Sequence, residues 1–182
     1  LGRKRVYEVS PLSLHEFIHH RTEYRYEGRL QEFLDLEKRR SEELLQEYLN
    51  YGGYPRVVLE VESREKRRVM DEIYQGYIMK DIAYLLKVEK VDAYAQLIRT
   101  LAGQSGQIIK YAELASTLGV AMATIKNYCW YAEGTYILQR ITPFFRNVRS
   151  EISKAPVVYF SDLGFRNFAL GVLGQLTQPR DW

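Results

Sequence analysis

The stretch KYAELASTLGVAMATIKNYCWYAE, residues 110–133, decides how the rest of the sequence is interpreted. Its apolar residues recur every three or four positions on both sides of Gly119, which predicts a helix over 110–118, a tight turn and a second helix over 122–133. Ile125, Tyr128 and Cys129 belong to the apolar side of the second helix. Two helices joined by a short glycine-containing turn are typical of the helix-turn-helix arrangement.

Two strand-like runs follow this pair of helices, at 136–141 and 157–160. The basic stretch between them, 146–151, suits the tip of a hairpin, so the runs predict a small antiparallel wing. Asp162 is placed to cap a last helix over 163–170. The order of helix, turn, helix, strand, basic loop and strand therefore predicts a winged helix.

The residues before this module predict a series of helices. Ser13 is placed to cap a first helix, and the apolar spacing over 30–49 predicts one or two amphipathic helices. The paired glycines and the proline of 51–55 end that region. A long helix follows from residue 62 to beyond Ile82, and a further helix ends at Gly103.

The expected fold class is mainly α: a helical region followed by a winged helix-turn-helix with a small antiparallel β-wing. We expect the helical region at 13–104, and the winged-helix domain with its following helix at 105–182. The segment from Arg5 to Val9 alternates like a strand, and because an unpaired strand edge is a liability we expect it to pair with another segment or chain.

Composition excludes several classes of protein. The chain has 182 residues, of which 46% are hydrophobic and 27% charged, as in an ordinary soluble globular protein. Its single cysteine, Cys129, excludes an internal disulfide framework and a multi-cysteine metal site. Because there is neither a run of about 18 apolar residues nor a secretory leader, we expect a cytoplasmic protein without a membrane span.

The distribution of charge makes the C-terminal part the candidate for a polyanion-binding surface. The net charge is +3, and the basic excess lies after residue 100. The candidate DNA-binding residues, on the second helix of the module and on its wing, are Thr124, Lys126, Asn127, Arg146, Arg149 and Lys154. So few cations predict weak, non-specific binding. The alternative is a solvated helix face with an exposed aromatic residue. Two placements of Trp130 stay open: a wedge against DNA, or packing on another domain.

His15-Glu16-Phe17-Ile18-His19 matches the H-E-x-x-H motif of zinc hydrolases, in which two imidazoles lie on one helix face. Catalytic zinc needs a third ligand, and the only other histidine is His20. Coincidence is therefore the favoured interpretation, and a zinc hydrolase remains the third hypothesis. We expect no catalytic residues and no metal site in this chain.

Nucleotide binding is not expected either. A phosphate-binding loop ends in Gly-Lys followed by Ser or Thr, and the chain contains no Gly-Lys pair. The run from Val157 to Asp162 is similar to an apolar strand ending in a metal-binding acid, but without the loop a wing strand is the favoured interpretation. We therefore expect no cofactor-binding residues in this chain.

Ordered motifs over nearly the whole chain resemble those of prokaryotic AAA-type ATPases that carry a C-terminal domain of unknown function. The segments at 1–3 and 11–17 resemble the stretch that closes the ATPase core, and Tyr51 to Pro55 is similar to the family's Y-G-G-Y-P motif. The remaining resemblances lie at 80–82, 101–111, 118–128, 143–147, 154–156 and 159–164. Two positions depart from the family pattern: Ala121 stands where the family has a Ser or Thr cap, and Trp130 where an acid is common.

The resemblance implies a function for the chain. Residues 1–12 would contain the last strand of the ATPase core, and ATP and Mg²⁺ would be bound by the parent protein upstream. The chain would then act as a DNA- or partner-binding module coupled to nucleotide state, with the upstream ATPase domain as a partner and a homo-oligomer as a further expectation. The rival hypothesis is a stand-alone winged-helix transcription regulator.

Overall fold

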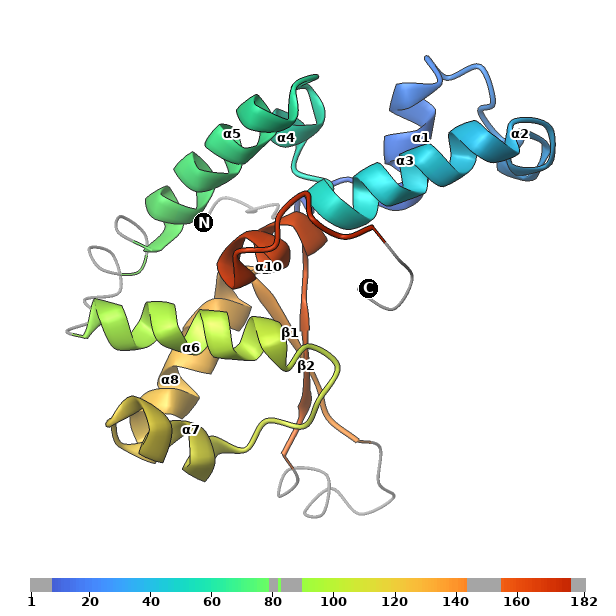
Figure 1. Ribbon diagram of the computed structural model, residues 1–182. Coiled ribbons are helices and arrows are strands. Elements are labelled where there is room, and N and C mark those ends of the chain that lie inside the picture. Colours follow the sequence, from blue (N-terminus) through green and yellow to red (C-terminus); the bar gives the residue numbers. More distant parts are fainter. Residues whose placement is uncertain (1–7, 79–81, 83–89, 144–154, 178–182) are drawn as a thin grey trace, which may run out of the picture.

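The computed structural model describes residues 8–78, 82, 90–143 and 155–177. The protein is mainly helical, with a small antiparallel sheet of two strands (Figure 1). The described helices are α1 (Leu14–Arg21), α2 (Leu30–Leu36), α3 (Lys38–Tyr51), α4 (Pro55–Val58), α5 (Ser63–Gln75), α6 (Val91–Gly103), α7 (Tyr111–Leu118), α8 (Met122–Gly134) and α10 (Leu163–Leu170). The strands are β1 (Leu138–Ile141) and β2 (Val157–Phe160).

Helix α10 lies in the middle of the molecule (Figure 1). It contacts α3, α5 and α6, so the last described helix packs against elements from both halves of the chain. Helices α1–α3 extend from one end, and α7 and α8 lie at the opposite end (Figure 1). The described chain begins beside the end of α8, since the Tyr136 hydroxyl donates to the Glu8 carboxylate at 3.2 Å.

Two hydrophobic cores follow from this arrangement. The larger core surrounds α10 and extends from α5 and α6 into α7, α8 and the sheet; its members include Tyr94, Leu101, Ile125, Leu138 and Phe165. The smaller core joins α1, α2, α3 and α4 and is built on Phe17, Ile18, Phe33, Leu44 and Val58. Burial of these side chains supplies most of the favourable free energy of folding.

Local sequence signals explain where several helices begin and end. The Ser13 side chain and the Glu16 side chain form a reciprocal capping box at the start of α1, which confirms the predicted cap. Asp162 caps α10 as predicted, since its carboxylate accepts from the Phe165 N–H at 2.7 Å. Gly119 ends α7 in the left-handed conformation that glycine adopts most readily.

The two strands pair antiparallel, with Leu138 opposite Phe160 and Ile141 opposite Val157. β1 begins at Leu138 and not at residue 136, because Tyr136 has a positive φ of 61° that is incompatible with an extended strand. On the other side of β2, the Ile109 N–H donates to the Pro156 carbonyl at 2.9 Å. The segment before α7 is therefore held beside the sheet.

Several expectations lie wholly or partly outside the described residues. The described end of the strand-like segment, Glu8 and Val9, is in neither helix nor strand, and residues 5–7 lie outside the described ranges. The regular α-helix predicted beyond Ile82 changes into a π-helical turn at residues 76–78. The boundaries 1–12, 13–104 and 105–182 stay predictions.

None of the helices in the described ranges is long and apolar enough to cross a bilayer.

The loop between α3 and α4 is locked to α10 and to the incoming chain, and we call this contact the Gly53–Asp162 joint. The Gly53 N–H donates to the Asp162 carboxylate at 2.7 Å, and the Gly53 carbonyl accepts from the Leu12 N–H at 2.8 Å. The Tyr48 hydroxyl donates to the Leu12 carbonyl at 2.8 Å. A Cβ atom at Gly53 would overlap the Leu12 carbonyl oxygen, so a side chain has no room there.

A second set of amide bonds fastens the same region. The Asn167 side chain on α10 donates to the carbonyls of Leu49 and Asn50, at 2.8 and 3.0 Å. The Asn50 side chain in turn donates to the Leu176 carbonyl and accepts from the Leu176 N–H, both at 2.9 Å. The end of α3 is thus bonded both to α10 and to the segment that follows it.

Candidate functional site

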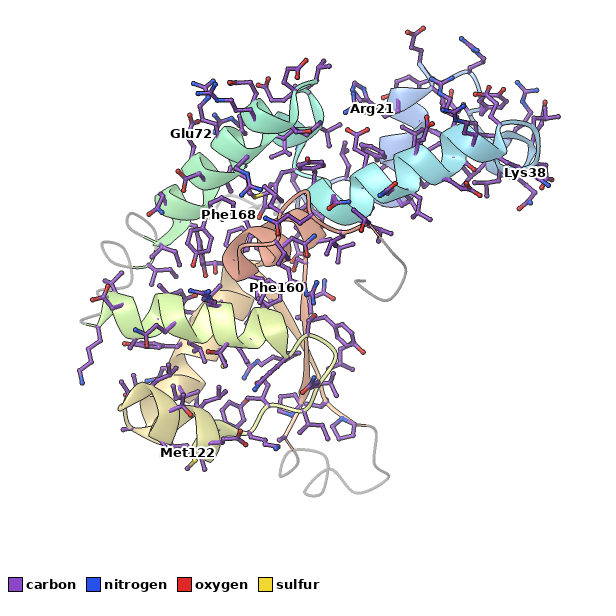
Figure 2. All side chains as sticks on the ribbon, viewed as in Figure 1. Arg21, Lys38, Glu72, Met122, Phe160 and Phe168 are labelled. Atoms are coloured by element: carbon purple, nitrogen blue, oxygen red, sulfur yellow. The ribbon has the colours of Figure 1, made fainter. Side chains whose placement is uncertain are left out.

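The exposed face of α8 carries the described part of the expected DNA-binding set. Lys126 and Asn127 are exposed, and Thr124 is half-buried. Trp130 and Met122 lie on the same side of the helix at eight-residue spacing, with 61% and 47% of their surface exposed. Met122 projects at the end of the molecule that is remote from α1–α3 (Figure 2).

The opposite side of α8 holds this face in place. Ile125, Tyr128 and Cys129 are buried in the larger core, as the apolar spacing predicts. Burial raises the pKa of the Cys129 thiol to about 11, so at neutral pH Cys129 is a protonated core residue. Ala121 precedes the helix and supplies no side-chain cap.

Neighbouring charges leave little positive potential on this face. Arg140 is bonded to the Glu133 carboxylate, with its Nε donating at 2.9 Å, and Lys110 pairs with Glu113 at 3.2 Å. The Lys126 ammonium lies 5.7 Å from the centre of the Tyr111 ring, a cation–π geometry. Over the described part of 105–143, Lys126 is the basic residue without a carboxylate partner.

The wing residues of the expected set, Arg146, Arg149 and Lys154, lie outside the described residues. The described structure therefore brings together Thr124, Lys126 and Asn127. Their proximity to the three wing cations stays a prediction.

The H-E-x-x-H motif forms most of α1, where its glutamate is part of the helix cap. The Glu16 carboxylate accepts from the Ser13 N–H and hydroxyl at 2.8 Å, which occupies it in the cap. The His15 and His19 rings pack against each other with centroids 4.1 Å apart. Across the described ranges no group of three or more His, Cys, Asp or Glu residues is arranged to hold a metal ion.

A pocket of about 290 Å³ lies beside this helix, between α1 and α4. Its lining residues are Leu12, Glu16, His19, His20, Tyr24, Pro55, Val58 and Leu59. His19 is 7% exposed, and its Nε2 has no hydrogen-bond partner among the described residues. This pocket is not predictable from the sequence, because its walls come from segments about 30 positions apart, and the histidine motif is the local signal at its position.

The contact between Gly53 and Asp162 was also not predicted from the sequence. The paired glycines were interpreted only as the end of a helix, and Asp162 only as a cap. One glycine is enough to end a helix, but two glycines are present here. The second glycine is the signal that could have indicated a close backbone approach.

These features define a mainly α domain with a small antiparallel sheet and an exposed face on α8. The chain belongs to the family described as Domain of unknown function (DUF8612), whose model matches residues 42–176.

Three curated relatives are similar to the chain. An uncharacterized protein of Haemophilus influenzae is 24% identical over 178 residues, which are 95% of this chain and 42% of the relative. Uncharacterized proteins of Mycobacterium bovis and Mycobacterium tuberculosis are each 25% identical over 130 residues, which are 71% of this chain and 30% of each relative. The chain thus spans less than half of the length of these relatives. No solved structure matches it significantly.

Proposed function

We propose that this chain is the helical and winged-helix portion of a larger AAA-type ATP-binding protein, in which the α8 face binds DNA in a manner coupled to nucleotide state. The observation that carries the proposal is the exposed α8 face with Lys126 and Asn127, on the second of two helices joined by a glycine turn and followed by an antiparallel pair of strands. That order is the one a winged helix requires. The length of the relatives leaves room for a nucleotide-binding core outside this chain.

The electrostatics of the face favour positioning on phosphates over reading of bases. Lys126 can neutralise one phosphate, and Arg146, Arg149 and Lys154 could neutralise three more. The half-buried Thr124 and the absence of a side-chain cap at Ala121 leave few groups that could read base edges. We therefore propose weak binding that depends little on DNA sequence.

The proposal is tested by fluorescence anisotropy with a labelled duplex of about 20 base pairs at several salt concentrations. The logarithm of the binding constant should fall against the logarithm of salt concentration with a slope no steeper than roughly −4, at about −0.9 per phosphate contact. Lys126→Ala should reduce the slope by about 1, and the pair Arg146→Ala and Arg149→Ala should weaken binding equally on all sequences.

A matched control is Lys38→Ala. Lys38 is exposed on α3, at the opposite end of the molecule from Met122 (Figure 2). Its replacement removes the same charge and should leave the slope and the affinity unchanged. Equal losses for Lys38→Ala and Lys126→Ala would contradict binding through α8.

A second candidate function is protein docking, which the exposed Trp130 and Met122 specifically favour. In this case the α8 face would contact another domain or protein. A mobility-shift assay at physiological salt would then show no DNA complex.

The nucleotide part of the proposal concerns the parent protein. Without a phosphate-binding loop, this chain offers neither a backbone cradle nor a lysine for the β- and γ-phosphates. Isothermal titration of the chain with Mg·ATP should therefore give no binding heat, and micromolar binding would contradict the assignment. A coding sequence for such a loop within about 250 residues upstream would support the ATPase, and its absence the stand-alone regulator.

A further inference from the structure

The structure exposes the sulfur-containing side chains of this protein unequally. The chain has one cysteine and three methionines. Met70 and Cys129 are 0% exposed, whereas Met122, at the start of α8, is 47% exposed; Met79 lies outside the described residues. Burial also raises the pKa of the Cys129 thiol to about 11, so the reactive thiolate is scarce at neutral pH. Among the described residues, a dissolved oxidant that attacks sulfur therefore meets the Met122 side chain first.

Met122 lies where an added polar oxygen would act on Lys126. The two residues are four positions apart, so they are neighbours on one face of α8. Side chains on a helix tilt toward its N-terminus, which brings the Lys126 side chain over the turn that begins with Met122. Lys126 has no carboxylate partner among the described residues, and its ammonium lies 5.7 Å from the centre of the Tyr111 ring. A new acceptor on Met122 would therefore meet an ammonium that no carboxylate of the described structure holds.

Oxidation converts the Met122 side chain from an apolar group into a hydrogen-bond acceptor. Hydrogen peroxide transfers one oxygen atom to the thioether: the O–O bond breaks, an S–O bond forms, the sulfur loses two electrons and the peroxide is reduced to water. The resulting sulfoxide is polar, and its oxygen accepts hydrogen bonds. The Lys126 ammonium has three N–H donors and no acceptor, so it is the matching partner on this face.

We propose that Met122 is a reversible oxidation site that controls the binding properties of the α8 face. In the reduced protein the Lys126 ammonium is available to a phosphate. In the sulfoxide form it donates to the oxygen on Met122, and the apolar surface that Met122 shares with Trp130 gains a polar group. Enzymes reduce methionine sulfoxide back to methionine, which makes the change reversible. The consequence for DNA rests on the proposed function, whereas the oxidation and the contact with Lys126 do not.

The first measurement identifies the oxidised residue. The whole chain is treated with dilute hydrogen peroxide, and peptide mass spectrometry follows the conversion of each methionine with time. Met122 should be converted at least roughly tenfold faster than Met70, because oxidation follows exposure and Met70 is buried in the larger core. Equal rates at the two residues would contradict the assignment of Met122 as the site.

The second measurement follows Lys126 with and without DNA. Without DNA, oxidation should shift the side-chain NMR signals of Lys126 more than those of Lys110, whose ammonium is paired with Glu113. With the labelled duplex, the oxidised chain should show a salt slope smaller by about 1, as expected for the loss of one lysine–phosphate contact. Treatment with methionine sulfoxide reductase should restore the slope of the reduced chain.

Met122→Leu is the matched control, because leucine is apolar, favours helices and has no sulfur. The variant keeps Met70, Met79 and Cys129, so any effect of their oxidation remains. Its salt slope should be the same before and after peroxide treatment. An equal change in this variant and in the unsubstituted chain, or unshifted Lys126 signals after conversion of Met122, would overturn the proposal. If the reduced chain binds no DNA, the proposed function fails, and the mass spectra and the Lys126 signals still decide on the oxidation site.

Discussion

Gly53→Ala is expected to lower the free energy of unfolding by about 3 kcal/mol, at the upper end of the usual range for overpacking a buried site. The added methyl group would overlap the carbonyl oxygen of Leu12, which belongs to the backbone and cannot rotate away. To remove this overlap, the chain segment that contains Leu12 must move. This movement breaks the hydrogen bonds that Leu12 makes with Gly53 and Tyr48. Urea unfolding followed by circular dichroism measures the change.

The control for this substitution is Gly134→Ala, at the end of α8. No atom lies within 4 Å of the position of its added methyl group, and its φ is not positive. Alanine there should be neutral or should stabilise the protein by up to about 1 kcal/mol. If Gly53→Ala were tolerated as well as Gly134→Ala, the close approach of Leu12 to Gly53 would be wrong.

Asp162→Ala is expected to destabilise the protein by about 3 to 5 kcal/mol. The carboxylate accepts from the N–H groups of Gly53 and Phe165, both at 2.7 Å, and its loss leaves both donors buried without a partner. Each buried unsatisfied donor costs about 1–3 kcal/mol. Asp71→Ala is the control, because Asp71 is exposed on α5 and accepts one long bond from Gln75, at 3.4 Å. Chemical unfolding should show a large loss of stability for Asp162→Ala and a small one for Asp71→Ala.

The same carboxyl group makes stability depend on pH. Burial raises the pKa of Asp162 to about 6, whereas its ordinary value is 3.8. At a pH between 3.8 and about 6, the Asp162 carboxyl group is protonated in the folded protein and ionised in the unfolded chain. The contribution of the protonated group to the free energy of unfolding is therefore complete below about pH 4. It is lost as pH rises through 6, and the total loss is about 3 kcal/mol. Asp162→Asn cannot titrate, so subtracting its unfolding free energy from that of the unsubstituted protein isolates the effect; a flat difference between pH 4 and 6 would contradict it.

Sequence reasoning identified the features that are determined by neighbouring residues. The caps at Ser13 and Asp162, the end of α7 at Gly119 and the buried side of α8 each depend on a few adjacent positions. The mainly helical class with a small antiparallel sheet followed from the same local patterns.

The features that depend on distant contacts were not predictable in this way. Gly53 and Asp162 are 109 positions apart, and their bond requires α10 to pack against the end of α3. The orphan nitrogen of His19 depends on the packing of α1, which composition and spacing do not specify. Within the candidate DNA-binding set, exposure of Lys126 and Asn127 followed from the opposite face of the helix being apolar. Trp130, outside that set, fitted two placements in the sequence, and the structure shows its side chain exposed.

The central position of α10 has a consequence for synthesis of the protein on the ribosome. More than one hundred residues separate Tyr51, at the end of α3, from Leu163, at the start of α10. At about 5–20 residues per second, translation takes on the order of 5–20 s to cover this distance. During that interval Asn50 has neither Asn167 nor Leu176 to bond, and the apolar side of α5 lacks the ring of Phe168, which packs on Tyr74. The nascent chain therefore exposes apolar surface, a feature that makes incompletely folded chains prone to aggregate, until its last helix has emerged.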